Sequence, residues 1–170
     1  VQLEGHYSSP TAYTNNLILN GEPIVDVVIP TDITEIGDFT FCHLPSLKSV
    51  TLHNEITRIG DYSFQNCTNI ESIEITNAVT YIGQRAFGNC SSLKEITIPA
   101  SVTYFESAFY DCGLEEVVIE EGVKSISVRV FENCSSLEKV TIPESVEAIY
   151  TGAFYNCSSL SSIIIPSSAT

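Results

Sequence analysis

A unit of about 23 residues recurs along nearly the whole chain. Each unit opens with a hexapeptide of the form aliphatic-x-x-aliphatic-x-aliphatic, and successive hexapeptides begin 23, 23, 23, 21, 23 and 23 residues apart. The seven hexapeptides are 24–29, 47–52, 70–75, 93–98, 114–119, 137–142 and 160–165. A fixed period of this length is typical of a solenoid, in which each turn of the chain stacks on the next one.

The remainder of the unit is also regular in the first six copies, which carry a second aliphatic pair and then an aromatic-x-x-Cys element. The second pairs are Ile33/Ile36, Ile56/Ile59, Val79/Ile82, Val102/Phe105, Val123/Ile126 and Val146/Ile149. The aromatic-cysteine elements are Phe39/Cys42, Phe64/Cys67, Phe87/Cys90, Phe109/Cys112, Phe131/Cys134 and Phe154/Cys157. The fourth unit lacks one residue between Ile98 and Phe109 and another in Cys112-Gly113-Leu114. We expect a local change in curvature there.

The hexapeptides are rich in β-branched residues and end in an apolar-polar alternation, which predicts short strands with one buried face. The Gly83–Phe87 stretch is long enough for only about one helical turn, which we expect on the convex side. One unit buries too few apolar side chains to offset the entropy of ordering it, so neighbouring turns must cover each other. We therefore predict a single curved parallel sheet on the concave side, with short strands, and loops and single helical turns on the convex side.

Two regions are expected along the chain. Residues 1–16 are polar and show no repeat register, which indicates a linker or a loose cap, whereas residues 17–170 form the solenoid of about six repeats plus a final strand. Leu17–Leu19 followed by Asn20-Gly21 predicts a hairpin-like cover over the first repeat. The apolar edge of the last hexapeptide has no polar cap, which favours a larger parent protein, a dimer through this C-terminal strand, or a last turn that tolerates exposure.

The charge of the chain restricts its partners. Seven basic residues stand against 21 acidic ones, for a formal net charge of −14, and there is no basic run. Such a surface repels nucleic acid and anionic lipid headgroups. No apolar stretch approaches the roughly 20 residues that a membrane-spanning helix needs, so we expect no membrane insertion.

The repeat resembles a known family. Residues 93–99, Leu-Lys-Glu-Ile-Thr-Ile-Pro, and the Val-x-x-Ile-Gly-x-x-Ala-Phe-x-x-Cys-x-x-Leu pattern of residues 79–93 are similar to the BspA-like leucine-rich repeats of bacterial and protist surface proteins. The resemblance covers residues 24–166. It implies a leucine-rich repeat solenoid, display outside the cell as a secreted or cell-surface protein, and a role in binding or adhesion.

The cysteines and asparagines have structural interpretations. Cysteines one turn apart are spaced near 4.8 Å with parallel side-chain directions, whereas a disulfide needs Cβ atoms about 3.8 Å apart, so buried free thiols are favoured. Four Asn-Cys-Ser/Thr sequences, at Asn66, Asn89, Asn133 and Asn156, match the glycosylation pattern. Because they recur at one point of the repeat, we favour asparagines that bond to local backbone groups and tolerate an unusual φ.

No catalytic, cofactor or metal site is predicted. The three histidines, at 6, 43 and 53, occupy unrelated repeat positions, and no nucleophile is paired with any of them. The acidic residues Glu115, Glu116, Glu120 and Glu121 could attract calcium, but strand alternation directs them to different faces, which favours a solvated acidic patch. We expect a non-enzymatic protein without cofactors.

The outward side chains of the predicted strands are the best candidate for function. On the alternation rule they form two rows that are acidic in the middle and suit a basic or mixed protein partner. The predicted partner-binding residues are Ser49, Thr51, Ser72, Glu74, Glu95, Thr97, Glu116, Val118, Lys139 and Thr141. Tyr81 and Tyr104, one turn apart, form a secondary patch, because exposed aromatic residues are enriched at binding hot spots.

The charge and the outward rows predict an acidic interaction module, and the resemblance implies that it is extracellular and binds or adheres, with a host protein, an extracellular matrix protein or a glycan as its ligand. A structural spacer within a larger cell-surface protein is the alternative. The two rows also fit an explanation without binding, in which Ser, Thr and Glu only keep an exposed sheet soluble.

Overall fold

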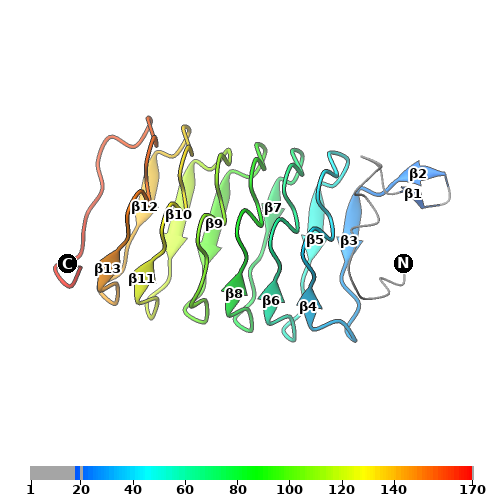
Figure 1. The fold of residues 1–170 in the computed structure, drawn as a ribbon, viewed down its shortest axis with the longest axis horizontal. Helices are drawn as coiled ribbons and strands as arrows, with labels where there is room; N and C mark the ends of the chain where they lie inside the picture. The colour runs from blue at the N-terminus through cyan, green and yellow to red at the C-terminus, as the bar shows by residue number, and fades with distance from the viewer. Residues whose placement is uncertain (1–17, 20, 170) are drawn as a thin grey trace.

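The computed structural model, which describes residues 18, 19 and 21–169, is a stack of parallel-strand turns along one axis (Figure 1). Six of the seven hexapeptides contribute strands, which make up the first row. These strands are β3 (Asp26–Val28), β5 (Ser49–Thr51), β7 (Ser72–Ile73), β9 (Glu95–Ile98), β10 (Glu116–Ile119) and β12 (Lys139–Thr141). They pair in parallel in the orders β3-β5-β7 and β9-β10-β12, and β7 lies beside β9. The predicted solenoid is therefore confirmed.

The second aliphatic pairs form a second row of two-residue strands. These strands are β4 (Glu35–Ile36), β6 (Arg58–Ile59), β8 (Tyr81–Ile82), β11 (Ser125–Ile126) and β13 (Ala148–Ile149). In this detail the prediction of a single sheet backed by helical turns is wrong, since residues 18, 19 and 21–169 contain no helix. The 83–87 segment makes one turn bond of its own, from the N–H of Ala86 to the carbonyl of Gly83 at 3.1 Å, and it also bonds to the neighbouring turn, as when the N–H of Phe87 donates to the carbonyl of Ala108 at 2.9 Å.

Residues in the left-handed backbone region recur in two columns along the solenoid. The first column is Phe39, Tyr62, Arg85, Ser107, Arg129 and Gly152, and the second is His43, Asn66, Asn89, Asp111, Asn133 and Asn156. Asparagine enters this region at a lower cost than most residues. The side chains also bond along the column, since Asn89 Nδ2 donates to Asn66 Oδ1 at 2.7 Å and Asn156 Nδ2 donates to Asn133 Oδ1 at 3.0 Å. The unusual φ predicted for these asparagines is confirmed, whereas their side chains bond to side chains of the neighbouring turn and not to local backbone groups as predicted.

A column of phenylalanine rings runs through the core. Its members are Phe41, Phe64, Phe87, Phe109, Phe131 and Phe154, and neighbouring ring centroids lie 5.2 to 5.7 Å apart. Burying one such side chain stabilises the fold by roughly 1.5–3 kcal/mol. Because each ring packs on the ring of the next turn, the turns stabilise one another.

The predicted register of the first unit is wrong. Phe39 is 46% exposed and stacks on Tyr62, whereas Phe41, which is 1% exposed, occupies the ring column. Leu44 then takes the place that a cysteine holds in later turns, and Cys42 is offset from the cysteine column. Phe39 and Cys42 match the aromatic-x-x-Cys spacing two residues early, because Phe39 is an extra aromatic residue at the left-handed position, two residues before Phe41.

The cysteines are buried, as predicted, and Cys67, Cys90, Cys112, Cys134 and Cys157 are free thiols. Five of them donate to the carbonyl oxygen of a phenylalanine in an earlier turn; the first is Cys67, whose Sγ lies 2.9 Å from the oxygen of Phe41. Burial raises the pKa of Cys67 to about 12 and that of Cys157 to about 11. At neutral pH these thiols are protonated, and they act as small packing groups.

The fourth turn is irregular, and the missing residue can be located. Tyr104 pairs with Tyr81. Glu106 and Gln84 are also equivalent, because each directly precedes a left-handed residue. Two residues separate Tyr81 from Gln84, but only one separates Tyr104 from Glu106, so the fourth turn lacks the counterpart of Gly83.

The second row is interrupted at this turn. In the third turn, the N–H of Gly83 donates to the carbonyl of Ile59 at 2.8 Å, and the fourth turn lacks the equivalent donor to the third turn, although Tyr104 still pairs with Tyr81. Among the described residues, no strand pairing joins Tyr104 to Ser125, and the row divides into β4-β6-β8 and β11-β13. The predicted change in curvature stays a prediction, whereas the break in the ladder is observed.

The predicted N-terminal hairpin is present, since β1 (Ile18–Leu19) pairs antiparallel with β2 (Glu22–Pro23), whereas its role as a cover over the first repeat stays a prediction. The linker or cap predicted for residues 1–16 lies outside the described residues, as do residues 17 and 20.

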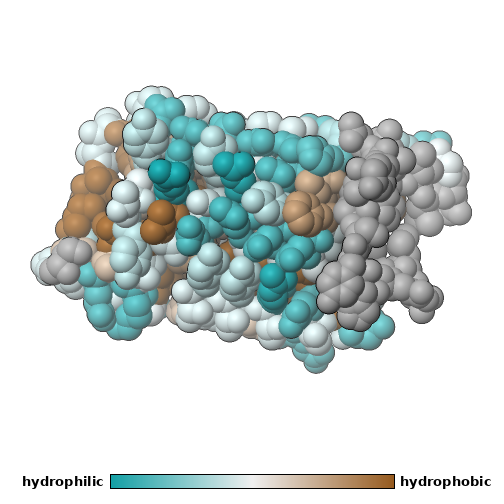
Figure 2. Space-filling view, in the orientation of Figure 1, coloured by the Kyte–Doolittle hydropathy of each residue, from teal (hydrophilic) through white to brown (hydrophobic). Residues whose placement is uncertain are grey.

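The last hexapeptide, 160–165, does not form the predicted final strand. The segment forms no strand pairing with β12, which is therefore the last strand of the row. Leu160 still packs against the core, but Ile164 is 85% and Ile165 is 49% exposed. Apolar surface accordingly gathers at the C-terminal end of the stack in Figure 2, while the middle of that face is mostly polar.

Candidate functional site

The outward side chains of the first row form two parallel lines, as the alternation rule predicts. Glu95, Glu116 and Lys139 are in register in the first line, as are Thr97, Val118 and Thr141 in the second. Towards the N-terminus the first line continues through Ser72, Ser49 and Asp26, and the second through Thr51 and Val28. The ten residues predicted to bind a partner therefore share one face of the solenoid.

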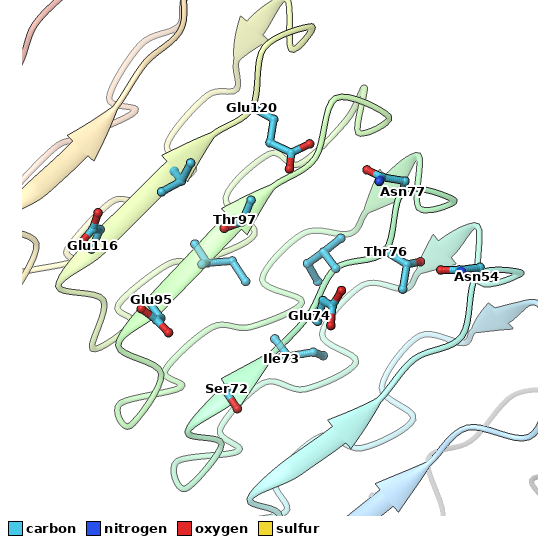
Figure 3. A pocket seen from close by; sticks show the side chains of 13 residues that line it. Asn54, Ser72, Ile73, Glu74, Thr76, Asn77, Glu95, Thr97, Glu116 and Glu120 are labelled. Atoms are coloured by element: carbon cyan, nitrogen blue, oxygen red, sulfur yellow. The ribbon is translucent and has the colours of Figure 1, made fainter.

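A hollow of about 610 Å³ lies on this face over β7, β9 and β10 (Figure 3). Six of the predicted residues line it, namely Ser72, Glu74, Glu95, Thr97, Glu116 and Val118. The other four, Ser49, Thr51, Lys139 and Thr141, stand in the same two lines but outside the hollow. The structure thus brings together the middle of the predicted surface and leaves its two ends apart.

Four polar residues that line the hollow were not among the predicted ones. They are Asn54, Thr76, Asn77 and Glu120, and they follow the strands rather than belonging to them. Thr76 and Glu120 stand at the position where other units carry the strand-ending Pro30, Pro99 and Pro143. A polar residue in place of that proline is the sequence feature that could have predicted Thr76 and Glu120 as part of the surface.

The hollow carries a negative charge. Glu74, Glu95, Glu116 and Glu120 all line it, and Glu116 forms an ion pair with Lys139, whose Nζ lies 2.5 Å from its Oε1. Within residues 18, 19 and 21–169 no cation pairs with the other three. Uncompensated carboxylates in a concave surface attract cationic groups.

The predicted scattering of the acidic cluster is right in part. Glu116 and Glu120 both line the hollow, whereas Glu115 lies outside it and pairs with Lys94 at 2.8 Å. Glu121 is exposed and does not line the hollow.

One buried hydroxyl borders the hollow without a protein partner. The Thr76 side chain is 9% exposed, and its Oγ1 has no hydrogen bond. An unsatisfied buried polar atom costs roughly 1–3 kcal/mol. A ligand or water that bonded to Thr76 would recover part of that cost.

The chemistry of the hollow suits binding. No histidine or cysteine lines it, and Glu74 and Glu95 are exposed. Exposed carboxylates lack the burial that adapts an acid to proton transfer near neutral pH. Within the described part of the chain, no cluster of His, Cys, Asp or Glu is arranged to hold a metal ion, and no helix is long and apolar enough to span a bilayer.

The secondary patch lies on the second row of strands. Tyr81 and Tyr104 stack with ring centroids 4.8 Å apart and an interplanar angle of 4°. Arg58 covers the other face of Tyr81, and the Tyr81 hydroxyl donates to Asp61 Oδ1 at 3.1 Å. Burial and then the nearby Asp61 carboxylate raise the pKa of Tyr81 above its ordinary value.

The sequence matches a family model described as BspA type leucine rich repeat region, in six copies over residues 15–108 and 105–170. No curated protein matches it.

Similar solved structures include a leucine-rich repeat protein from Bacteroides ovatus ATCC 8483, with 29% identity, a TM-score of 0.79 and coverage of 86% of this chain and 38% of that one. A leucine rich cell surface protein from Faecalibacterium prausnitzii A2-165 has 35% identity and a TM-score of 0.76, with 88% of this chain and 44% of that chain covered. The leucine-rich repeat protein of T. pallidum has 26% identity and a TM-score of 0.71, with coverages of 84% and 74%. The chain spans less than half of the length of the first two.

Proposed function

Because the chain belongs to the BspA-type leucine-rich repeat family, we propose that it is a non-catalytic interaction module that binds a partner protein through the outward face of the first row of strands. The acidic hollow over β7, β9 and β10 carries this proposal. Residues from both lines of outward side chains line it, together with polar residues that follow the strands.

The partner that fits this surface is a protein segment with lysine or arginine side chains. Glu74, Glu95 and Glu120 supply carboxylates without an ion-pair partner among the described residues. Val118 adds an apolar contact, and Thr76 and Thr97 add hydroxyl groups. Charge complementarity of this kind mainly speeds association and selects among partners, while packing and hydrogen bonds determine how long the complex lasts.

The module acts at the cell surface in this proposal. The F. prausnitzii protein, which is 35% identical to the chain, is named as a cell surface protein. Adhesion to a host or matrix protein is the corresponding role, and a glycan is the competing ligand. Localisation is measured by protease accessibility of the protein on intact cells of the source organism.

Charge reversal in the hollow tests the binding site. The double variant E74K/E95K is expected to weaken binding to lysine-rich and arginine-rich peptides on an array by at least about tenfold, a change of roughly 1.4 kcal/mol. The matched control is E71K/E138K, because both residues are exposed and neither lines the hollow. Each double variant makes the net charge less negative by four, from −14 to −10.

The two variants separate a site from a general charge effect. Weaker binding for E74K/E95K alone supports the hollow. An equal loss of affinity in both variants would mean that only the net charge matters. Unchanged binding by E74K/E95K would mean that the binding site is not the hollow. A glycan array with the wild-type protein reports on the competing ligand.

A structural spacer is the second candidate function. The column of phenylalanine rings from Phe41 to Phe154 continues through all six turns, and continuous packing of this kind supports a rigid spacer. A spacer needs only this rigidity. Peptide and glycan arrays that both show no binding would favour the spacer, whereas saturable binding that depends on Glu95 would favour the interaction module.

A further inference from the structure

A stack of side chains on the second row ends abruptly at Tyr104. Arg58, Tyr81 and Tyr104 occupy equivalent positions in three successive turns. The Arg58 guanidinium carbon lies 4.8 Å from the centroid of the Tyr81 ring, and the Tyr104 ring covers the opposite face of Tyr81 at 4.8 Å. Tyr81 therefore has both of its faces covered, and Tyr104 has one.

The second face of Tyr104 looks toward a turn with small side chains. The equivalent positions in the next two turns are Ser125 and Ala148, which pair with each other. No aromatic ring or cation of the described chain rests on this face, and Tyr104 is 38% exposed. The break in the second ladder falls between Tyr104 and Ser125, so the stack and the backbone pairing are interrupted at the same place.

The second turn shows that an arginine side chain fits against a ring of this row, although Arg58 covers the N-terminal side of Tyr81 and the open face of Tyr104 is the C-terminal one. Arg58 lies against the Tyr81 ring, and its Nη2 donates to Asp38 Oδ1 of the preceding turn at 3.0 Å. Asp38 directly precedes a left-handed residue. Glu106 holds the same place in the fourth turn, and its Oε2 accepts a hydrogen bond from the Tyr104 hydroxyl at 3.3 Å. A carboxylate therefore stands beside the uncovered ring, as Asp38 stands beside Arg58.

We propose that the space above Ser125 is a binding site for an arginine side chain of a partner protein, stacked on Tyr104 and paired with Glu106. A planar guanidinium can stack on a ring and donate to a carboxylate at once, which the compact ammonium group of lysine does less well. The net charge of −14 favours an incoming cation. This site is separate from the hollow, and neither proposal depends on the other.

N-acetyl-arginine amide is the probe, and the Tyr104 ring signals in NMR spectra of the full chain are the readout. We expect the arginine probe to shift these signals saturably, with an affinity at least twofold higher than that of N-acetyl-lysine amide. The variants Y104L and E106Q should each weaken binding by roughly two- to fivefold, judged from ring and amide signals near Ser125. The control Y150L removes another exposed tyrosine, which is 52% exposed, and should leave the affinity unchanged.

The variant S125R provides the sharpest test. Its new side chain stands where Arg58 stands in the second turn, so the variant is expected to fold, to cover Tyr104 and to abolish binding of the probe. Equal shifts with the lysine and arginine probes would overturn the proposal, as would full binding by S125R. A response to methyl glucoside without a response to the arginine probe would make the ring a sugar platform and would also overturn it.

Discussion

Replacing Phe87 by alanine tests whether the stack of turns, more than any single turn, stabilises the fold. Phe87 is fully buried, and its ring lies 5.2 Å from that of Phe64 and 5.3 Å from that of Phe109. Removing a buried phenylalanine costs about 3–5 kcal/mol, and each lost ring pair contributes roughly 0.5–1.5 kcal/mol of that cost. Because Phe87 has two ring neighbours, F87A should lower the free energy of unfolding by an amount near the upper end of this range, about 5 kcal/mol.

Phe154 provides the comparison within the same column. It is only partly buried, and its one ring neighbour is Phe131 at 5.6 Å. One missing ring pair and incomplete burial lower the expected cost of F154A to about 2 kcal/mol. Tyr155, which is 66% exposed, is the surface control, and Y155A should change stability by about 0.5 kcal/mol or less.

Equilibrium urea unfolding, followed by circular dichroism, measures all three free energies of unfolding. The expected order is F87A, then F154A, then Y155A, with a gap of roughly 2–3 kcal/mol between the first two. If F154A were as destabilising as F87A, the number of stacked neighbours would not control stability, and the reasoning from the ring column would fail.

Two further predictions concern the columns. Raising the pH above about 9 should lower the free energy of unfolding, because burial raises the pKa of Cys67 from 9.0 to about 12 and that of Cys157 from 9.0 to about 11, so the thiols ionise first in the unfolded chain. Urea unfolding at about pH 8 and about pH 10 measures this, and a flat profile would contradict it. Asn89→Ala should lower the free energy of unfolding by about 2–3 kcal/mol, because it removes the hydrogen bond to Asn66 and places alanine at a φ of 61°. Asn89→Gly should lower it by about 1 kcal/mol less, because glycine adopts this φ without strain. Equal costs in urea unfolding would remove the backbone explanation.

The repeat period was sufficient to predict the solenoid, the first row of strands and the buried thiols. Each depends on like residues meeting one turn apart, which is a property of spacing alone. The second row was missed because a pair such as Arg58–Ile59 is too short to show an alternation pattern. The register of the first unit was wrong because Phe39 and Phe41 both satisfy an aromatic consensus, and only packing distinguishes them.

The candidate surface was predictable in composition but not in shape. Strand alternation places Glu95 and Glu116 on the outward face, and they lie there. The hollow also needs Thr76 and Glu120 from beyond the strand ends. Their position depends on how the chain leaves each strand, which the alternation rule does not describe.

The asparagine column has a consequence for how chains of this kind are interpreted. Asn66, Asn89, Asn133 and Asn156 match a repeated glycosylation pattern, yet they occupy a left-handed backbone position that recurs in every turn and that asparagine adopts at a lower cost than most residues. Residues that repeat at the same position in every turn therefore indicate a structural requirement of the solenoid. Positions that differ from turn to turn are the candidates for recognition of a partner. The fourth turn differs most from the others, since it lacks one residue and places Tyr104 next to Ser125.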